Sequence, residues 1–236
     1  MKKRLSEADF LGYINIQNPT FNRQMVFGFL ILFLWAFGVA PLYAAPFSPF
    51  FVDLGLYPAV LVTIMAVPYL FAPWKLEPYF YFLLGILSAV TGYCQLVVVV
   101  KYLYAWLLPE SFLLLYVIFG SYVLEVIVMN LVNLKWLKDG TYRRYHENPE
   151  SVNYKLIINF LIGCLVLCAI VFFLFYDTAS YFMVIIVTLS FFQLILAYFT
   201  TFFHKGIVIR RHMDLTKKYW PGFGDTWQER KWRYED

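Results

Sequence analysis

Six long apolar stretches dominate this chain of 236 residues. An α-helix rises about 1.5 Å per residue, so about 20 apolar residues cross a hydrocarbon core about 30 Å thick. Each stretch is long enough to do so. The sequence therefore predicts an all-α, polytopic membrane protein with six transmembrane helices, at Met25–Ala45, Leu56–Pro73, Tyr79–Val100, Ser111–Asn133, Lys155–Tyr176 and Ser180–Phe203.

The composition leaves little room for a separate soluble domain. Hydrophobic residues make up 61% of the chain and charged residues 14%, well outside the range of soluble domains. The polar segments are too short to bury a core of their own. We expect an N-terminal segment on the inner side (1–24), a six-helix transmembrane domain (25–203) and a basic, aromatic C-terminal tail on the inner side (204–236).

The basic residues predict the orientation. All but Lys101 of the 19 Lys and Arg residues lie on one side of the predicted bundle. Basic loops stay on the side from which a membrane protein is inserted. Both termini should therefore face the cytoplasm, or the matrix if this is an organelle protein, which places the chain in a bacterial plasma membrane or the mitochondrial inner membrane. The same basic face attracts anionic phospholipid, so bound lipid is expected but no other cofactor and no nucleic acid.

Prolines concentrate in the first half of the chain. Seven of the 11 lie between Pro41 and Pro78. Proline removes a backbone hydrogen bond, so Pro68 should kink the second span, and we expect Pro46–Gly55 to be an interfacial connection rather than part of a span. Broken helices mark transport sites in some families. Without a matching break in the second half, the prolines are better interpreted as punctuation of helix ends.

Glu125 is the one acidic residue well inside a predicted span. An ionisable group at that depth is a functional-site hypothesis by default. Counting the helical rise places Ser88 and Gln193 at the same depth, whereas Gln95 lies nearer the outer face. Glu125 is then either a proton or cation site between helices, or a neutral carboxyl that hydrogen-bonds a neighbouring helix or subunit. The absence of a basic or second acidic partner favours the second interpretation.

Two further patterns indicate packing and docking. Gly85, Ser88, Ala89 and Gly92 recur at helical spacing and form a stripe of small residues, which lets another helix approach closely. The C-terminal tail combines cations with tryptophans, residue types that dominate protein–protein contacts. The tail residues expected to dock are Arg210, Arg211, Trp220, Trp227 and Trp232.

Enzyme motifs are missing from the sequence. The three histidines, His146, His204 and His212, form no metal-binding motif, and no intramembrane serine has a histidine at its depth to activate it. No phosphate-binding loop or pair of haem-ligating histidines is present either. We expect no catalytic residue, no metal and no enzymatic activity.

These features favour a non-catalytic accessory or scaffold subunit of a multi-subunit membrane complex, of the respiratory or another energy-converting kind. Its partners would be other integral membrane subunits and lipids. One alternative is a small transporter or permease subunit with a site around Glu125, Gln193 and Ser88. Another is an immunity or sensor protein that recognises a membrane-active toxin.

Overall fold

The computed structural model describes residues 6–14, 16–106, 112–147 and 178–225, and within these ranges it contains helices and no strands. Five of its helical segments are long and apolar enough to cross a membrane. The prediction of an all-α integral membrane protein is thereby confirmed. The predicted span Lys155–Tyr176 lies outside the described residues, so the sixth crossing stays a prediction.

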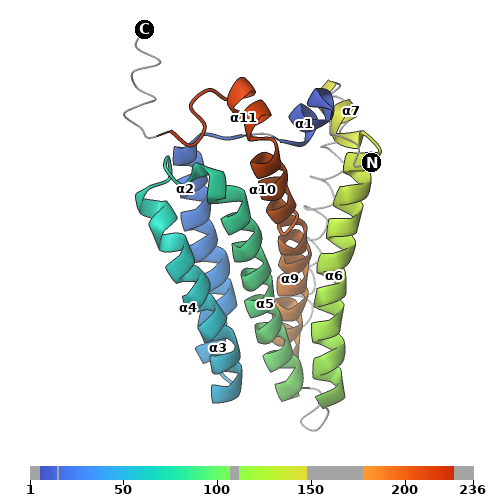
Figure 1. Ribbon diagram of the computed structural model, residues 1–236. Helices are drawn as coiled ribbons and strands as arrows, with labels where there is room; N and C mark the ends of the chain where they lie inside the picture. The colour runs from blue at the N-terminus through green and yellow to red at the C-terminus, as the bar shows by residue number, and fades with distance from the viewer. Residues whose placement is uncertain (1–5, 15, 107–111, 148–177, 226–236) are drawn as a thin grey trace.

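The long helices run side by side (Figure 1); they alternate in direction from α2 to α6, and α9 runs parallel to α6. The first crossing is continuous from α2 through the π-helix η1 to α3. α4 returns, a 3₁₀ turn (η2) follows, and α5, α6 and α9 complete the bundle. The bounds are α2 Pro19–Gly28, η1 Phe29–Val39, α3 Ala40–Tyr43, α4 Pro49–Phe71, η2 Glu77–Tyr79, α5 Phe80–Trp106, α6 Phe112–Lys138 and α9 Thr178–Phe199.

Short helices gather at one end of the bundle (Figure 1). They are α1 (Glu7–Tyr13), α7 (Thr141–Glu147) and α11 (Met213–Tyr219), the last joined to α9 by α10 (Phe202–Arg211). This end, which carries the cations of α7, α10 and α11, is called the basic end, and the opposite one the Lys101 end. α1, which precedes α2, and α11, which follows α10, both lie at the basic end.

Two predicted boundaries move toward the chain's N-terminus. The first crossing begins at Pro19 rather than Met25, because the Asn18 side chain accepts a hydrogen bond from the Thr20 amide (2.9 Å) and caps the helix. The prediction for Pro46–Gly55 is wrong over most of its length, since α4 already begins at Pro49. Proline is favoured at a first helical position, where its missing N–H costs nothing.

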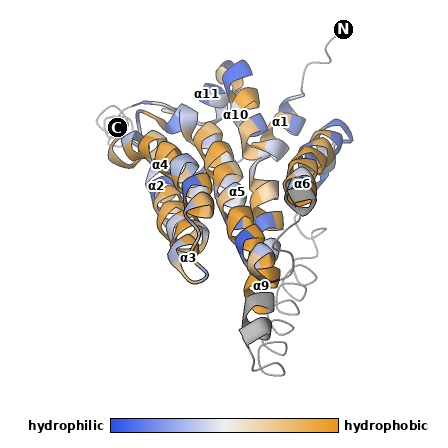
Figure 2. Ribbon diagram, turned by 90° about the horizontal axis from the view of Figure 1, so that it is seen from below, coloured by the Kyte–Doolittle hydropathy of each residue, from blue (hydrophilic) through white to orange (hydrophobic). Residues whose placement is uncertain are grey.

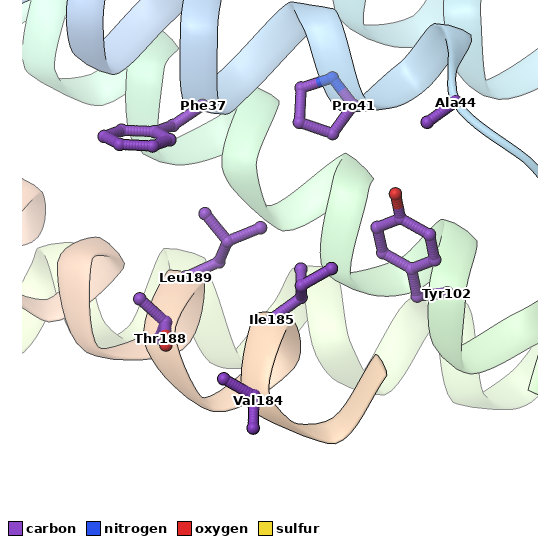
Figure 3. Close-up of a pocket in the computed structure, with 8 residues that line it drawn as sticks. All are labelled: Phe37, Pro41, Ala44, Tyr102, Val184, Ile185, Thr188 and Leu189. Carbon is purple, nitrogen blue, oxygen red and sulfur yellow. The ribbon is translucent and has the colours of Figure 1, made fainter. Parts of the chain in front are cut away.

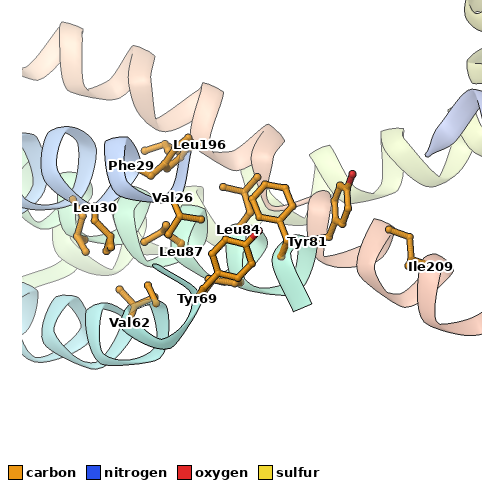
Figure 4. Packing of buried hydrophobic residues seen from close by; sticks show 14 of the residues in the cluster. Val26, Phe29, Leu30, Val62, Tyr69, Tyr81, Leu84, Leu87, Leu196 and Ile209 are labelled. Carbon is orange, nitrogen blue, oxygen red and sulfur yellow. The ribbon is translucent and has the colours of Figure 1, made fainter. Parts of the chain in front are cut away.

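α5 is the central helix of the fold. It packs against α4, η1, α9 and α10. Within the spans, 78% of its apolar window is buried, against 11% for α6. The core around α5 joins residues of α2 and η1, α4 and α9 into one cluster (Figure 4), which includes Val26, Val62, Leu84, Leu87 and Leu196.

The outward faces of the helices are as apolar as the core. On α4, Phe71 is 85% and Tyr57 71% exposed, and Leu61 and Ile64 are exposed as well. Orange, apolar residues cover the bundle helices on their outer sides too, while blue ones collect near the basic end (Figure 2). Helices that are hydrophobic all round suit a lipid environment.

Candidate functional site

A buried lysine closes the Lys101 end. The Lys101 side chain on α5 is 1% exposed. Its Nζ donates hydrogen bonds to the carbonyls of Pro41 (2.7 Å), Leu42 (3.0 Å) and Ala44 (2.6 Å) at the end of α3. Helix carbonyls at a C-terminus lack partners and carry partial negative charge, so a cation is stabilised there. Lys101 therefore fixes α3 to α5.

Other polar side chains inside the spans also tie helices together. Trp35 Nε1 donates to Thr63 Oγ1 (3.1 Å) between η1 and α4. Gln95 Nε2 donates to the Phe33 carbonyl (3.3 Å) between α5 and η1. Such bonds replace the solvation that lipid cannot provide.

α6 is held by two further ties of this kind. Tyr122 Oη donates to the Ala89 carbonyl on α5 (2.7 Å). Asn130 Nδ2 donates to Thr200 Oγ1, just beyond α9 (2.9 Å). These bonds join α6 to α5 and to the segment after α9.

The residues predicted around Glu125 are not joined by hydrogen bonds within the described part of the chain. Ser88 is fully buried, and its hydroxyl donates to the Leu84 carbonyl on its own helix (2.7 Å). Gln193 is buried on α9. Glu125 is half-buried on α6, and its Oε2 is shielded from solvent without a hydrogen-bond partner.

The small-residue stripe lies where other elements approach α5. A Cβ added at Gly85 would lie 2.6 Å from the Phe203 backbone nitrogen, and one at Gly92 would lie 2.5 Å from Tyr122 Oη. The Ala89 carbonyl accepts the Tyr122 bond. Gly85 and Gly92 thus meet α10 and α6, respectively, while Ser88 is turned into the core.

A buried polar network at the basic end connects four elements. Asn133 Nδ2 of α6 donates to Tyr13 Oη of α1 (2.9 Å), and that hydroxyl also bonds His204 Nδ1 of α10 (2.9 Å). Tyr142 of α7 donates to Asn133 Oδ1 (2.6 Å). The Lys205 ammonium lies 5.3 Å from the centre of the Tyr13 ring. Burial raises the pKa of Tyr13 above its ordinary value, so its hydroxyl stays protonated.

The two terminal segments also meet at this end. Lys218 Nζ pairs with Glu7 Oε1 (2.9 Å), and Tyr219 Oη donates to Glu7 Oε2 (2.8 Å). The rings of Phe10 and Trp220 meet edge to face, with centroids 6.3 Å apart. The Lys218 contacts hold the pKa of Glu7 below its usual range. Both charged groups are exposed, so the ion pair adds little stability beyond the ring packing.

The predicted docking residues of the tail differ in their surroundings. Trp220 packs on Phe10 of the same chain. The Arg210 guanidinium lies over the rings of Tyr79 and Phe82 (5.5 and 5.7 Å to the ring centres). Arg211 is exposed. Trp227 and Trp232 lie outside the described residues.

The turn after α11 is fixed by a buried carboxylate. Glu77 is 2% exposed, and its Oε2 accepts a hydrogen bond from the Gly224 amide (2.9 Å). Gly222 and Gly224 have φ values of 86° and 79°, which other residues rarely adopt. Glu77 on η2 thus anchors the segment that follows α11.

Two hollows open on the part of the bundle that the structure describes. One, of about 350 Å³, lies between η1–α3, α5 and α9 and includes Phe37, Pro41, Tyr102 and Ile185 (Figure 3). None of its lining residues is charged, so it suits a hydrocarbon chain. The other, of about 430 Å³, lies between α2 and α4 near the basic end and includes Arg23. Across the described ranges, no three His, Cys, Asp or Glu residues are placed to hold a metal ion.

The sequence interpretation missed the basic-end network. Asn133 and His204 each stand at the basic end of a predicted span, so their shared depth was a usable signal. Tyr13 lies in the polar N-terminal segment, 120 residues from Asn133 and 191 from His204, and nothing in its sequence context marks it.

No protein-family model, curated protein or solved structure matches the chain.

Proposed function

We propose that this chain is a non-catalytic accessory or scaffold subunit of a larger membrane assembly, of the kind found in respiratory and other energy-converting complexes. Its membrane is the mitochondrial inner membrane or a bacterial plasma membrane, and its basic end faces the matrix or cytoplasm, as the charge asymmetry favours. It acts as a rigid body on which partner helices pack.

The use of polar side chains inside the spans carries this proposal. Trp35, Gln95, Lys101, Tyr122 and Asn130 each donate a hydrogen bond to another helix or helix end. A transport path needs polar groups that exchange partners with water or substrate. These groups instead hold helices together, which supports a structural role.

The basic end supplies a surface for partners outside the membrane. Trp220 packs on Phe10 of the same chain, whereas Arg210, Arg211 and Lys217 are exposed, Arg210 with its guanidinium over two aromatic rings. Docking at this end therefore depends on exposed cations and selects a partner with an acidic surface.

Purification from native membrane tests the proposal. Gentle detergent extraction, size separation and mass spectrometry should recover a stoichiometric set of other membrane subunits. The double charge reversal Arg211→Glu with Lys217→Glu should release them, and the matched reversal Lys135→Glu on α6 should not. Recovery of the wild-type chain as a lone monomer or homodimer would overturn the proposal.

A small transporter or permease subunit is the second candidate, and one observation favours it. Within the residues that the structure describes, Glu125 Oε2 is shielded from solvent and has no hydrogen-bond partner, as expected of a carboxylate kept free for a proton or cation. In proteoliposomes, Glu125→Gln should then abolish proton or cation flux, while Gly120→Ala on the same helix should preserve it. Equal flux through the wild type and Glu125→Gln would exclude this candidate.

A further inference from the structure

The hollow between α2 and α4 has a charged half and an apolar half. Its lining residues are Arg23, Gln24, Phe27, Gly28 and Leu70, around a volume of about 430 Å³. On α2, Arg23 and Phe27 lie one turn apart, and so do Gln24 and Gly28. These four residues therefore form one face of the helix. Leu70 closes the hollow from the last turn of α4.

The polar side chains of the hollow lie nearest the basic end. Arg23 stands about one turn from the start of α2, and both Arg23 and Gln24 are exposed. Within the described part of the chain, the Arg23 guanidinium has no ion pair or hydrogen bond. A planar guanidinium with free donors matches a phosphate group in shape and charge.

The apolar half lies one turn deeper into the span. Phe27 is 57% exposed there. Gly28 ends α2 where the helix widens into the π-helix η1. Along α2, the cation Arg23 comes first, and the apolar Phe27 and Gly28 lie deeper in the span. A phospholipid has the same order, with its phosphate at the membrane surface and its acyl chains below.

Gly28, like Gly120, differs from the closely packed glycines of this bundle. A Cβ added at Gly85, Gly92 or Gly206 would lie within 2.8 Å of a neighbouring atom, so those glycines allow close packing. A Cβ at Gly28 would meet nothing within 4 Å. Glycine in a helix costs about 1 kcal/mol relative to alanine, and at this position no helix contact offsets that cost. Since Gly28 lines the hollow, its missing side chain leaves room there.

We propose that this hollow binds one anionic phospholipid, with the phosphate on Arg23 and Gln24 and an acyl chain over Gly28 between Phe27 and Leu70. The site adds a named lipid contact to the chain and does not depend on the subunit role. Failure of the lipid test would leave that role intact, and loss of partners would leave the lipid site intact.

Native mass spectrometry of the full chain in detergent tests the site. Phosphatidylglycerol and phosphatidylcholine with the same acyl chains are titrated in parallel. Phosphatidylglycerol should bind the wild type more tightly. Arg23→Ala should weaken phosphatidylglycerol binding about fivefold, the value of one interfacial cation, and weaken phosphatidylcholine less, because the choline ammonium offsets the charge of its phosphate, while Arg23→Lys should restore most of the preference.

A substitution that fills the hollow provides a second, independent test of the lipid site. Gly28→Leu should weaken both lipids without loss of fold, since its Cβ meets no neighbour. Gly120 on α6 is equally open, so Gly120→Leu is the matched control and should bind as the wild type does. Lys135→Ala is the control for charge.

Three outcomes would overturn the proposal. The first is equal affinity of the wild type for the two lipids. The second is unchanged phosphatidylglycerol binding in both Arg23→Ala and Gly28→Leu. The third is displacement of the lipid by inorganic phosphate at millimolar concentration, which would assign the site to a free anion.

Discussion

Lys101 shows how a buried ammonium group can be stabilised inside the bundle without a carboxylate partner. Three carbonyls at the end of α3 accept its donors. Lys101→Met keeps the length of the side chain but leaves these acceptors without the ammonium. Hydrogen bonds to a charged group contribute about 1.5–3 kcal/mol each, and removing the burial of the charge offsets part of that. We expect the free energy of unfolding in detergent to fall by about 2 kcal/mol.

Lys135 offers the matched control for that substitution. It is exposed at the basic end of α6, so Lys135→Met should change the free energy of unfolding by less than about 0.5 kcal/mol. If both variants unfold alike, the carbonyl bonds of Lys101 do not contribute to stability.

The buried hydroxyl of Tyr13 should lower the free energy of unfolding at alkaline pH. Its pKa is raised in the folded protein by burial, so the stability is constant below the unfolded pKa of about 10 and falls as the pH rises above it. The slope is about 1.4 kcal/mol per pH unit for this one group. Tyr13→Phe should remove that part of the slope. Equal slopes between pH 10 and 11 in unfolding titrations of the two proteins would contradict the assignment.

At the level of the helices, two glycines should respond to alanine with opposite signs. At Gly85 the added Cβ would meet the Phe203 backbone of α10, and overpacking of this kind costs about 1–3 kcal/mol. At Gly120 it would meet nothing, so helix propensity should raise the stability by up to about 1 kcal/mol. Thermal unfolding of the two variants checks this, and destabilisation by both would show that α6 also needs its glycine.

The helices also show what the sequence could predict. Apolar length identified the five described spans. The start of α4 was missed because an apolar, proline-rich segment reads equally well as a connection or as a first helical turn. The partners of Lys101 and Tyr13 were missed because they depend on how helices pack, which hydropathy does not encode.

For the molecule as a whole, the same-side placement of both terminal segments is testable. With the native cysteines replaced, Ser6→Cys and Lys217→Cys should react with a membrane-impermeant maleimide from one side of the membrane. Phe47→Cys, which is exposed in the turn after α3, should react only from the other. Inverted and right-side-out vesicles distinguish the two faces. Labelling of Ser6→Cys and Lys217→Cys from opposite sides would refute the fold's topology.

The contacts of α1 impose an order on biosynthesis. Tyr13 bonds His204, which leaves the ribosome 191 positions later, and Glu7 pairs with Lys218, which leaves it 211 positions later. The first helix to be made can pack against α6 and α7 as soon as these are synthesised, but its contacts are complete only after α10 and α11 have left the ribosome. A chain stalled before that point would leave Phe10 without the Trp220 ring that packs on it.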